Sequence, residues 1–133
     1  TSMIAEAIGL GVAIDYLSRL GMDAVRDHER ELTRLALERL GELEGVQVIG
    51  PASAAERGGV ISFTVTGMHP HDVAELLNRE AVCIRAGHHC AQPLMRRLGV
   101  QSTSRASFGP YNVADDVDAF VAALARAREV FQL

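Results

Sequence analysis

The stretch IRAGHHCAQPLM, residues 84–95, holds the side chains best suited to chemistry in this sequence. Two histidines, His88 and His89, stand directly before Cys90, and Arg85 stands a few positions ahead of it. A cysteine attacks as its thiolate, which neighbouring positive charge or a helix N-terminus stabilises. The arginine and the histidines supply cationic or hydrogen-bonding groups, and a short helix expected just after the cysteine would point its N-terminus at the sulfur. The stretch therefore favours an exposed, activated thiol at Cys90.

Two other roles for this cysteine remain open, a buried thiol and a zinc ligand. Free cysteines often fill a core, and we expect that of Cys83 in the apolar run 82–84, whereas the polar neighbours of Cys90 support burial poorly. Zinc-ligand types do occur near one another: His69, His71, His88, His89 and Cys90. Three adjacent residues do not easily all point at one ion, and the sequence has no Cys-x-x-Cys pair, so we expect no metal site.

Two arginines outside this stretch raise opposite expectations. Arg105, between Ser104 and Ala106, falls on a predicted strand, where a planar guanidinium is suited to clamp a carboxylate. A structural ion pair remains the alternative for Arg105. Arg57, just before two glycines, is expected to be a turn residue with an exposed side chain.

Composition limits the classes of protein to which the chain can belong. With 133 residues, 48% of them hydrophobic, it can bury the core of one domain. The net charge of -4 and the scattered arginines give no basic stripe for nucleic acid, and no apolar run is long enough to span a membrane. We expect a cytoplasmic protein with two free thiols. All 13 basic residues are arginine, so no lysine is present to bind pyridoxal phosphate covalently.

The elements that must position these residues mix helices and strands without strict alternation. Apolar periodicity predicts helices over 3–20, 22–43 and 69–80, a short helix over 92–99, and a terminal helix over 113–133. Runs rich in β-formers predict strands at 46–49, 58–67, 81–87 and 104–109. The order favours an α+β fold in which a small sheet of about four strands is packed by helices. No linker divides the chain, so 1–133 is expected to form a single domain.

The stretch RAGHHCAQPLM, followed by RASFGPYN, resembles the SufS-type cysteine desulfurases of the class V aminotransferase superfamily. The resemblance also covers AIGLGVAIDYLSRLGMDAVRDHERELTRLALERL, GGVISFTV, HPHDVAELL and DDVDAFVAALARAREVF, in the order of that family's C-terminal third. It implies the small domain of a pyridoxal-phosphate enzyme that converts L-cysteine to L-alanine. The sulfur stays on the loop cysteine as a persulfide for iron–sulfur cluster assembly.

The resemblance also implies roles for particular residues. Cys90 is expected to attack the sulfur of the substrate, Arg105 to clamp the substrate carboxylate, and Arg85 to stand at the mouth of the active site. The histidines at 88 and 89 would shape the electrostatics of the loop. His71 resembles a histidine that joins the zinc of a U-type sulfur acceptor, with an exposed helix-entry histidine as the alternative. Thr1 matches a threonine that reaches the cofactor phosphate of the neighbouring subunit.

A complete desulfurase has a large domain that carries the cofactor lysine, and this chain has no lysine. We therefore expect the isolated chain to be inactive, and its cofactor, pyridoxal phosphate, to be held by the full-length homodimer. The expected partners are L-cysteine or selenocysteine and a U-type or E-type acceptor protein. From another class of function, the chain could be a stand-alone persulfide carrier or an acceptor-docking module.

Overall fold

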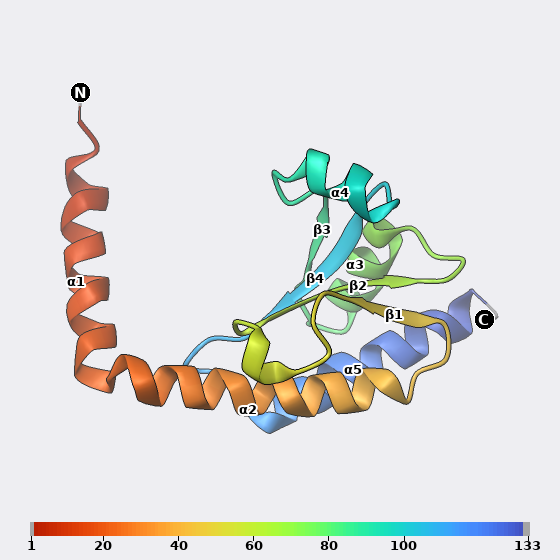
Figure 1. The fold of residues 1–133 in the computed structure, drawn as a ribbon, viewed down its shortest axis with the longest axis horizontal. Coiled ribbons are helices and arrows are strands. Elements are labelled where there is room, and N and C mark those ends of the chain that lie inside the picture. The colour runs from red at the N-terminus through yellow and green to blue at the C-terminus, as the bar shows by residue number, and fades with distance from the viewer. Residues whose placement is uncertain (1, 132–133) are drawn as a thin grey trace.

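The computed structural model describes residues 2–131, which form five α-helices, one 3-10 turn and four strands (Figure 1). In chain order the elements are α1 (Ile4–Leu20), α2 (Met22–Gly41), β1 (Val46–Ile49), η1 (Ala54–Glu56), β2 (Val60–Val65), α3 (Pro70–Arg79), β3 (Arg85–Gly87), α4 (Gln92–Leu98), β4 (Thr103–Ser107) and α5 (Ala114–Val130). The α+β prediction is confirmed.

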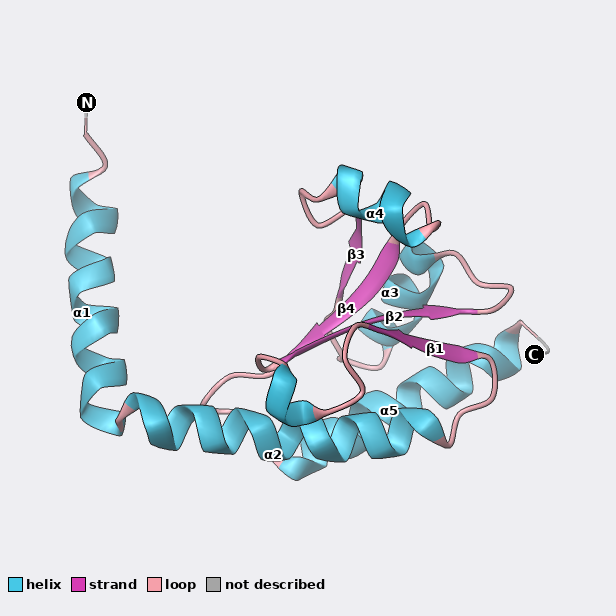
Figure 2. Ribbon diagram, in the orientation of Figure 1, coloured by secondary structure: helices cyan, strands magenta, loops and turns pink. Residues whose placement is uncertain are grey.

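The four strands form one antiparallel sheet in the order β1-β2-β4-β3 (Figure 2). Along β2, the alternating residues Ile61, Phe63 and Val65 are buried, as expected when one face of a sheet covers a core. Helices α2, α3 and α5 contribute to the same core, where the rings of Phe63 and Phe120 lie 5.7 Å apart. The opposite face of β2 carries the polar side chains of Ser62 and Thr64 beside Val60.

The first helix stands apart from these layers. Helix α1 has no buried residue, and it extends away from the sheet beyond the turn at Gly21 (Figure 1). Its large apolar side chains are exposed, for example Ile8 at 66% and Val12 at 62%. None of the helices in residues 2–131 is both long and apolar enough to cross a membrane.

The strand predicted over 81–87 is much shorter in the structure, which corrects the expectation for Cys83. The end of α3 takes up the first residues of that run, because Val82 N donates to Leu77 O at 3.0 Å and Ala81 has φ +59°. A left-handed residue after a helix is a common way to end it. The strand begins only at Arg85, and Cys83 is exposed instead of buried, with its thiol 3.7 Å from Asn78 Oδ1.

The prediction of an exposed Arg57 was also wrong. Its side chain is 9% exposed and donates hydrogen bonds to Pro51 O and Ile49 O, the second at 2.8 Å. These bonds tie the segment after β1 to the segment before β2. Burial lowers the pKa of the Arg57 guanidinium from its usual range. Arg57 therefore stabilises a connection in the fold, which a local sequence pattern does not reveal.

Candidate active-site loop

The loop that carries Cys90 is a tight reverse turn with an uncommon backbone. After β3 the chain turns at Gly87, whose φ of +122° favours glycine. His89 and Cys90 follow with φ of +55° and +58°, and Ala91 N donates to His88 O at 2.9 Å. Two consecutive positive φ values closed by such a bond are the pattern of a type I′ turn. The sequence did not indicate this strained conformation, which presents Cys90 at the second central position of the turn.

The thiol of Cys90 is exposed and faces an arginine. The Nη2 atom of Arg85 donates to Cys90 Sγ at 3.7 Å. Arg85 is the first residue of β3 and Cys90 lies in the turn that follows it, so the short strand places the guanidinium beside the sulfur. The arrangement can support a sulfur nucleophile that is open to solvent.

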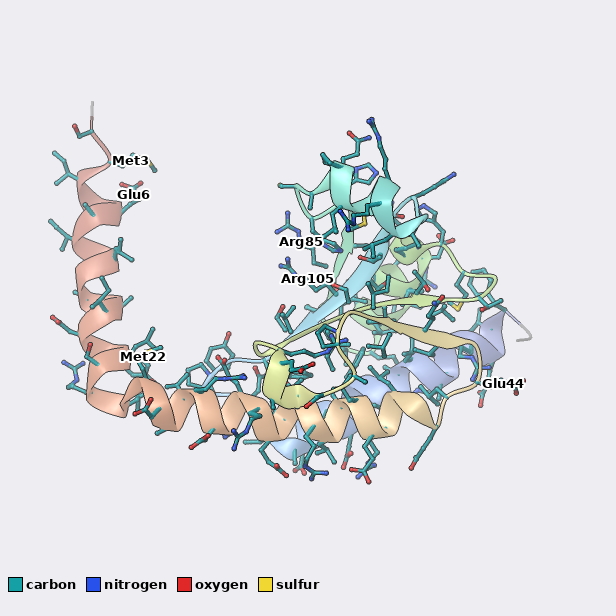
Figure 3. All side chains as sticks on the ribbon, viewed as in Figure 1. Met3, Glu6, Met22, Glu44, Arg85 and Arg105 are labelled. Carbon is teal, nitrogen blue, oxygen red and sulfur yellow. The ribbon has the colours of Figure 1, made fainter. Side chains whose placement is uncertain are left out.

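Arg85 and Arg105 lie directly opposite each other on neighbouring strands. The β3–β4 register pairs the two arginines, and the β2–β4 register pairs Arg105 with Ser62. Because cross-strand partners share one face, and the neighbours Ile61 and Phe63 of Ser62 face the core, both arginines project from the opposite face. Figure 3 shows both side chains leaving the sheet on the same side.

This pair of arginines concentrates positive charge on one face of the sheet. Like charges directly across a strand pair repel, so the pairing costs stability unless something compensates it. Arg105 is half-buried, and its Nε is buried without a hydrogen-bond partner in residues 2–131. Buried donors are normally satisfied, and a guanidinium is satisfied best by a carboxylate that accepts two parallel bonds. A carboxylate between Arg85 and Arg105 would satisfy both conditions.

His88 is exposed, whereas His89 turns inward and is held by Thr103. The Nε2 atom of His89 lies 2.8 Å from Thr103 Oγ1 and 3.1 Å from Thr103 O. Since a carbonyl oxygen only accepts, the geometry assigns the proton to Nε2. Burial lowers the pKa of His89 below its usual 6.5, and the charge of Arg105 lowers it further. His89 is therefore a neutral side chain at pH 7 that ties the turn to β4.

Thr103 is a residue of the site that the sequence analysis missed. It is fully buried at the start of β4 and pairs with Gly87 across the strands. The one sequence signal for it was its position two residues before Arg105 on the same strand, which places both side chains on one face of the sheet.

His71 lies beside the start of the Cys90 loop, although it is far from it in sequence. Its Nε2 is 3.9 Å from the position that a Cβ on Gly87 would take. His69, which precedes α3, accepts a hydrogen bond at Nδ1 from the backbone N–H of His71, and the two rings pack edge to face with centroids 5.0 Å apart. The fold thus brings His71 to the same end of the sheet as Cys90.

Two further expectations concern cofactor and metal binding. Thr1, expected near a cofactor phosphate, lies outside the described residues. Within residues 2–131, no group of three or more histidine, cysteine, aspartate or glutamate side chains gathers where it could hold a metal ion.

Known proteins are similar to this chain over nearly its whole length. The probable cysteine desulfurase of Halalkalibacterium halodurans is 50% identical over 131 residues, which are 98% of this chain and 32% of that protein. The probable cysteine desulfurase of Staphylococcus aureus has the same identity and coverage. The chain thus spans about a third of the length of the curated relatives it matches.

Solved structures agree with these relatives. The cysteine desulfurase CsdA of Escherichia coli superposes with a TM-score of 0.88 at 36% identity, over 98% of this chain and 32% of that one. The cysteine desulfurase of Thermococcus onnurineus gives a TM-score of 0.90 at 41% identity, over 100% of this chain and 32% of that one. A family model, described as aminotransferase class V, matches residues 1–120. The chain belongs to the class V aminotransferase family.

Proposed function

We propose that this chain is the C-terminal, small domain of a SufS-type cysteine desulfurase. The whole enzyme is a pyridoxal-phosphate-dependent transferase that converts L-cysteine to L-alanine and holds the sulfur as a persulfide on Cys90. The sulfur is then passed on for iron–sulfur cluster assembly. The observation that carries the proposal is the exposed Cys90 thiol on a strained turn, 3.7 Å from the guanidinium of Arg85.

The chemical step assigned to this chain is a sulfur transfer. The Cys90 thiolate attacks the sulfur of L-cysteine, so a sulfur–sulfur bond forms while the carbon–sulfur bond of the substrate breaks. The electron pair of the broken bond stays with the carbon, which takes up a proton and becomes the methyl group of alanine. The Arg85 guanidinium donates to the sulfur at 3.7 Å, and the turn keeps the sulfur at the surface, where a substrate can reach it.

Arg105 orients the amino acid. Its partly buried guanidinium, with an unpaired Nε, fits the substrate carboxylate and would fix the direction in which the substrate sulfur points. Arg85 carries a second positive charge on the same face of the sheet, near both the carboxylate and the thiol. The two arginines therefore couple binding of the substrate to presentation of its sulfur.

Among residues 2–131 we assign none to the cofactor. The chain has no lysine to bond the cofactor aldehyde, and the unpaired Nε of Arg105 fits a small carboxylate on the sheet face. Pyridoxal phosphate, held by residues of the enzyme outside this chain, supplies the electron sink for breaking the carbon–sulfur bond. We therefore expect the isolated chain to be inactive.

The proposal extends to partners. The substrate is L-cysteine or selenocysteine, the receiving protein is a U-type or E-type sulfur acceptor, and the full-length enzyme is a cytoplasmic homodimer. The position of His71 next to Gly87 supports a role in the exchange of zinc with a U-type acceptor, since the imidazole and the persulfide would face the same partner.

The test uses alanine formation by the whole enzyme and by the isolated chain. With L-cysteine and dithiothreitol, we expect the whole enzyme to form alanine, Cys90→Ser to lose this activity and Cys83→Ser, the matched control, to keep it. The isolated chain should form none and bind no stoichiometric cofactor. Equal loss of activity in both cysteine variants, or alanine formation by the isolated chain, would contradict the proposal.

A stand-alone persulfide carrier is the second candidate, favoured by the exposed thiol in a chain without lysine. It is distinguished by mass spectrometry after the isolated chain is exposed to a sulfane-sulfur donor. A sulfur adduct that depends on Cys90 supports a carrier, whereas no adduct, or equal labelling of Cys83, argues against it.

A further inference from the structure

The segment around Cys90 contains basic residues but no acidic ones. Residues 81–114 contain no aspartate or glutamate, and they carry four arginines, whereas all 17 acidic residues lie elsewhere in the chain. The four are Arg85, Arg96, Arg97 and Arg105. None of them takes part in an ion pair within residues 2–131. A protein of net charge -4 thus has a positively charged region around Cys90.

Two of these arginines are placed for something other than substrate binding. Arg96 and Arg97 lie in the last turn of α4, at the end of the sheet that carries the Cys90 loop (Figure 1), and both are exposed. Arg105 and Arg85, in contrast, come from the strands. Arg96 and Arg97 therefore add positive charge at the same end of the sheet as the Cys90 loop, but outside the proposed carboxylate site.

Helix α4 also exposes apolar surface beside this charge. Met95 is 5% exposed and anchors the helix, whereas Leu94 and Leu98 are 49% and 41% exposed. Residues four apart share a helix face, so the two leucines form one ridge, with Arg97 next to it. On the other side of Met95 lies a groove of about 310 Å³, bordered by Arg96 and by His88 of the Cys90 loop. Apolar anchors within a charged rim are the usual anatomy of a protein–protein contact.

We propose that α4, with its leucine ridge and the groove beside it, docks the protein that receives sulfur from Cys90. This inference rests on the proposed function, which requires a receiving protein. The charge identifies the partner chemically. Its docking face carries acidic side chains around at least one exposed apolar side chain, because Arg96 and Arg97, which form no ion pair within residues 2–131, repel a basic surface. Docking there brings the partner thiol next to the turn that presents Cys90.

The experiment compares a small-molecule acceptor of Cys90 sulfur with acceptor proteins, using the whole enzyme. Dithiothreitol, a small neutral thiol, needs no docking surface, whereas purified U-type and E-type acceptor proteins of the source organism do. The variant is Arg96→Gln/Arg97→Gln. The control is Arg30→Gln/Arg79→Gln, which removes the same charge from exposed side chains on α2 and α3. Alanine formation is measured with each acceptor at low and high salt.

We expect the α4 variant to keep the dithiothreitol-supported rate and to raise the KM for the acceptor protein about tenfold at low salt. High salt should shrink the difference, because it screens the charges in the native enzyme as well. Leu94→Gln, which changes no charge, should also raise this KM. The control pair should change neither value.

Several outcomes would overturn the docking proposal. These are an unchanged KM for both acceptor proteins, an equal rise in the control pair, and loss of the dithiothreitol-supported rate in the α4 variant, which would place the arginines in the chemistry. Absence of alanine formation by the native enzyme with dithiothreitol is a different result. It would refute the proposed function itself.

Discussion

The left-handed backbone at Cys90 predicts an unusual order of stability among variants that lack the thiol. The left-handed region costs an L-residue with a side chain about 1–2 kcal/mol of conformational free energy, whereas it costs glycine almost none. Cys90 has φ +58°. Cys90→Ala and Cys90→Gly both remove the sulfur and its bond from Arg85, so the backbone distinguishes them.

The expected difference follows from two opposing effects. Glycine relieves the strain at Cys90, but it also loses about 0.4–1 kcal/mol through the greater freedom of the unfolded chain. The net advantage of Cys90→Gly over Cys90→Ala is therefore about 1 kcal/mol. With a typical denaturant dependence, this corresponds to a shift of about 0.5 M in the urea midpoint.

The chain contains its own control for this experiment. Cys83 is also exposed, and its backbone lies outside the left-handed region. There the order should reverse, with Cys83→Ala more stable than Cys83→Gly by about 0.5 kcal/mol. Urea unfolding followed by circular dichroism gives all four values. If Cys90→Gly were no more stable than Cys90→Ala, the strained turn would be refuted.

Three further predictions concern His89, Arg57 and Arg105. Burial, and then the charge of Arg105, lowers the pKa of His89 in the folded chain, so protonation of His89 favours the unfolded chain. The contribution of His89 to the free energy of unfolding is therefore complete above pH 6.5 and falls as the pH drops below that value. His89 should change the free energy of unfolding by at most about 1.4 kcal/mol per pH unit. Urea unfolding across this pH range should show a weaker pH dependence of stability in His89→Gln than in the native chain. Arg57→Leu should destabilise the chain by about 2 kcal/mol in the same assay, since Ile49 O and Pro51 O lose their donor; an unchanged midpoint would contradict this. In the whole enzyme, Arg105→Lys should raise the KM for L-cysteine about 10- to 100-fold, because lysine cannot form two parallel bonds with a carboxylate, and steady-state kinetics with Arg126→Lys as control would show whether it does.

The elements of the fold were predictable because their signals are local. The helix at 69–80 was marked by Pro70 in its first turn and by apolar residues on one face, and the structure has it as Pro70–Arg79. The strands at 46–49, 58–67 and 104–109 were marked by β-formers bounded by glycines or turns. The structure has the first with the predicted bounds and the other two as Val60–Val65 and Thr103–Ser107. Periodicity and turn residues act over a few positions, so the sequence displays them directly.

The two local predictions that were wrong depended on hydrogen bonds between residues five to eight positions apart. Cys83 lies in an apolar run, but the preceding residues Ala81 and Val82 close the end of α3, which leaves the thiol exposed. Arg57 precedes two glycines, which usually indicates an exposed turn, but its guanidinium binds carbonyl groups of the segment after β1. In both cases the hydrogen-bond partner lies beyond the immediate neighbours, so the short apolar or glycine pattern does not reveal it.

The candidate site was predictable in its residues but not in its geometry. The sequence indicated Cys90, Arg85 and Arg105 by residue type, whereas the cross-strand pairing of the two arginines follows from the β3–β4 register. Register depends on which strands become neighbours, and β3 pairs with β4 across the whole of α4. The inward orientation of His89 likewise required knowledge that Thr103 lies beside it.

The position of the sulfur after one turnover tests the proposed role of Cys90 most directly. The whole enzyme is mixed with a single equivalent of L-cysteine without any acceptor, its free thiols are blocked, and its peptides are analysed by mass spectrometry. We predict one extra sulfur atom on the peptide that contains Cys90, together with one equivalent of alanine, and none on the peptide of Cys83. Alanine formation with the extra sulfur on Cys83, or on no cysteine of this chain, would contradict the central claim.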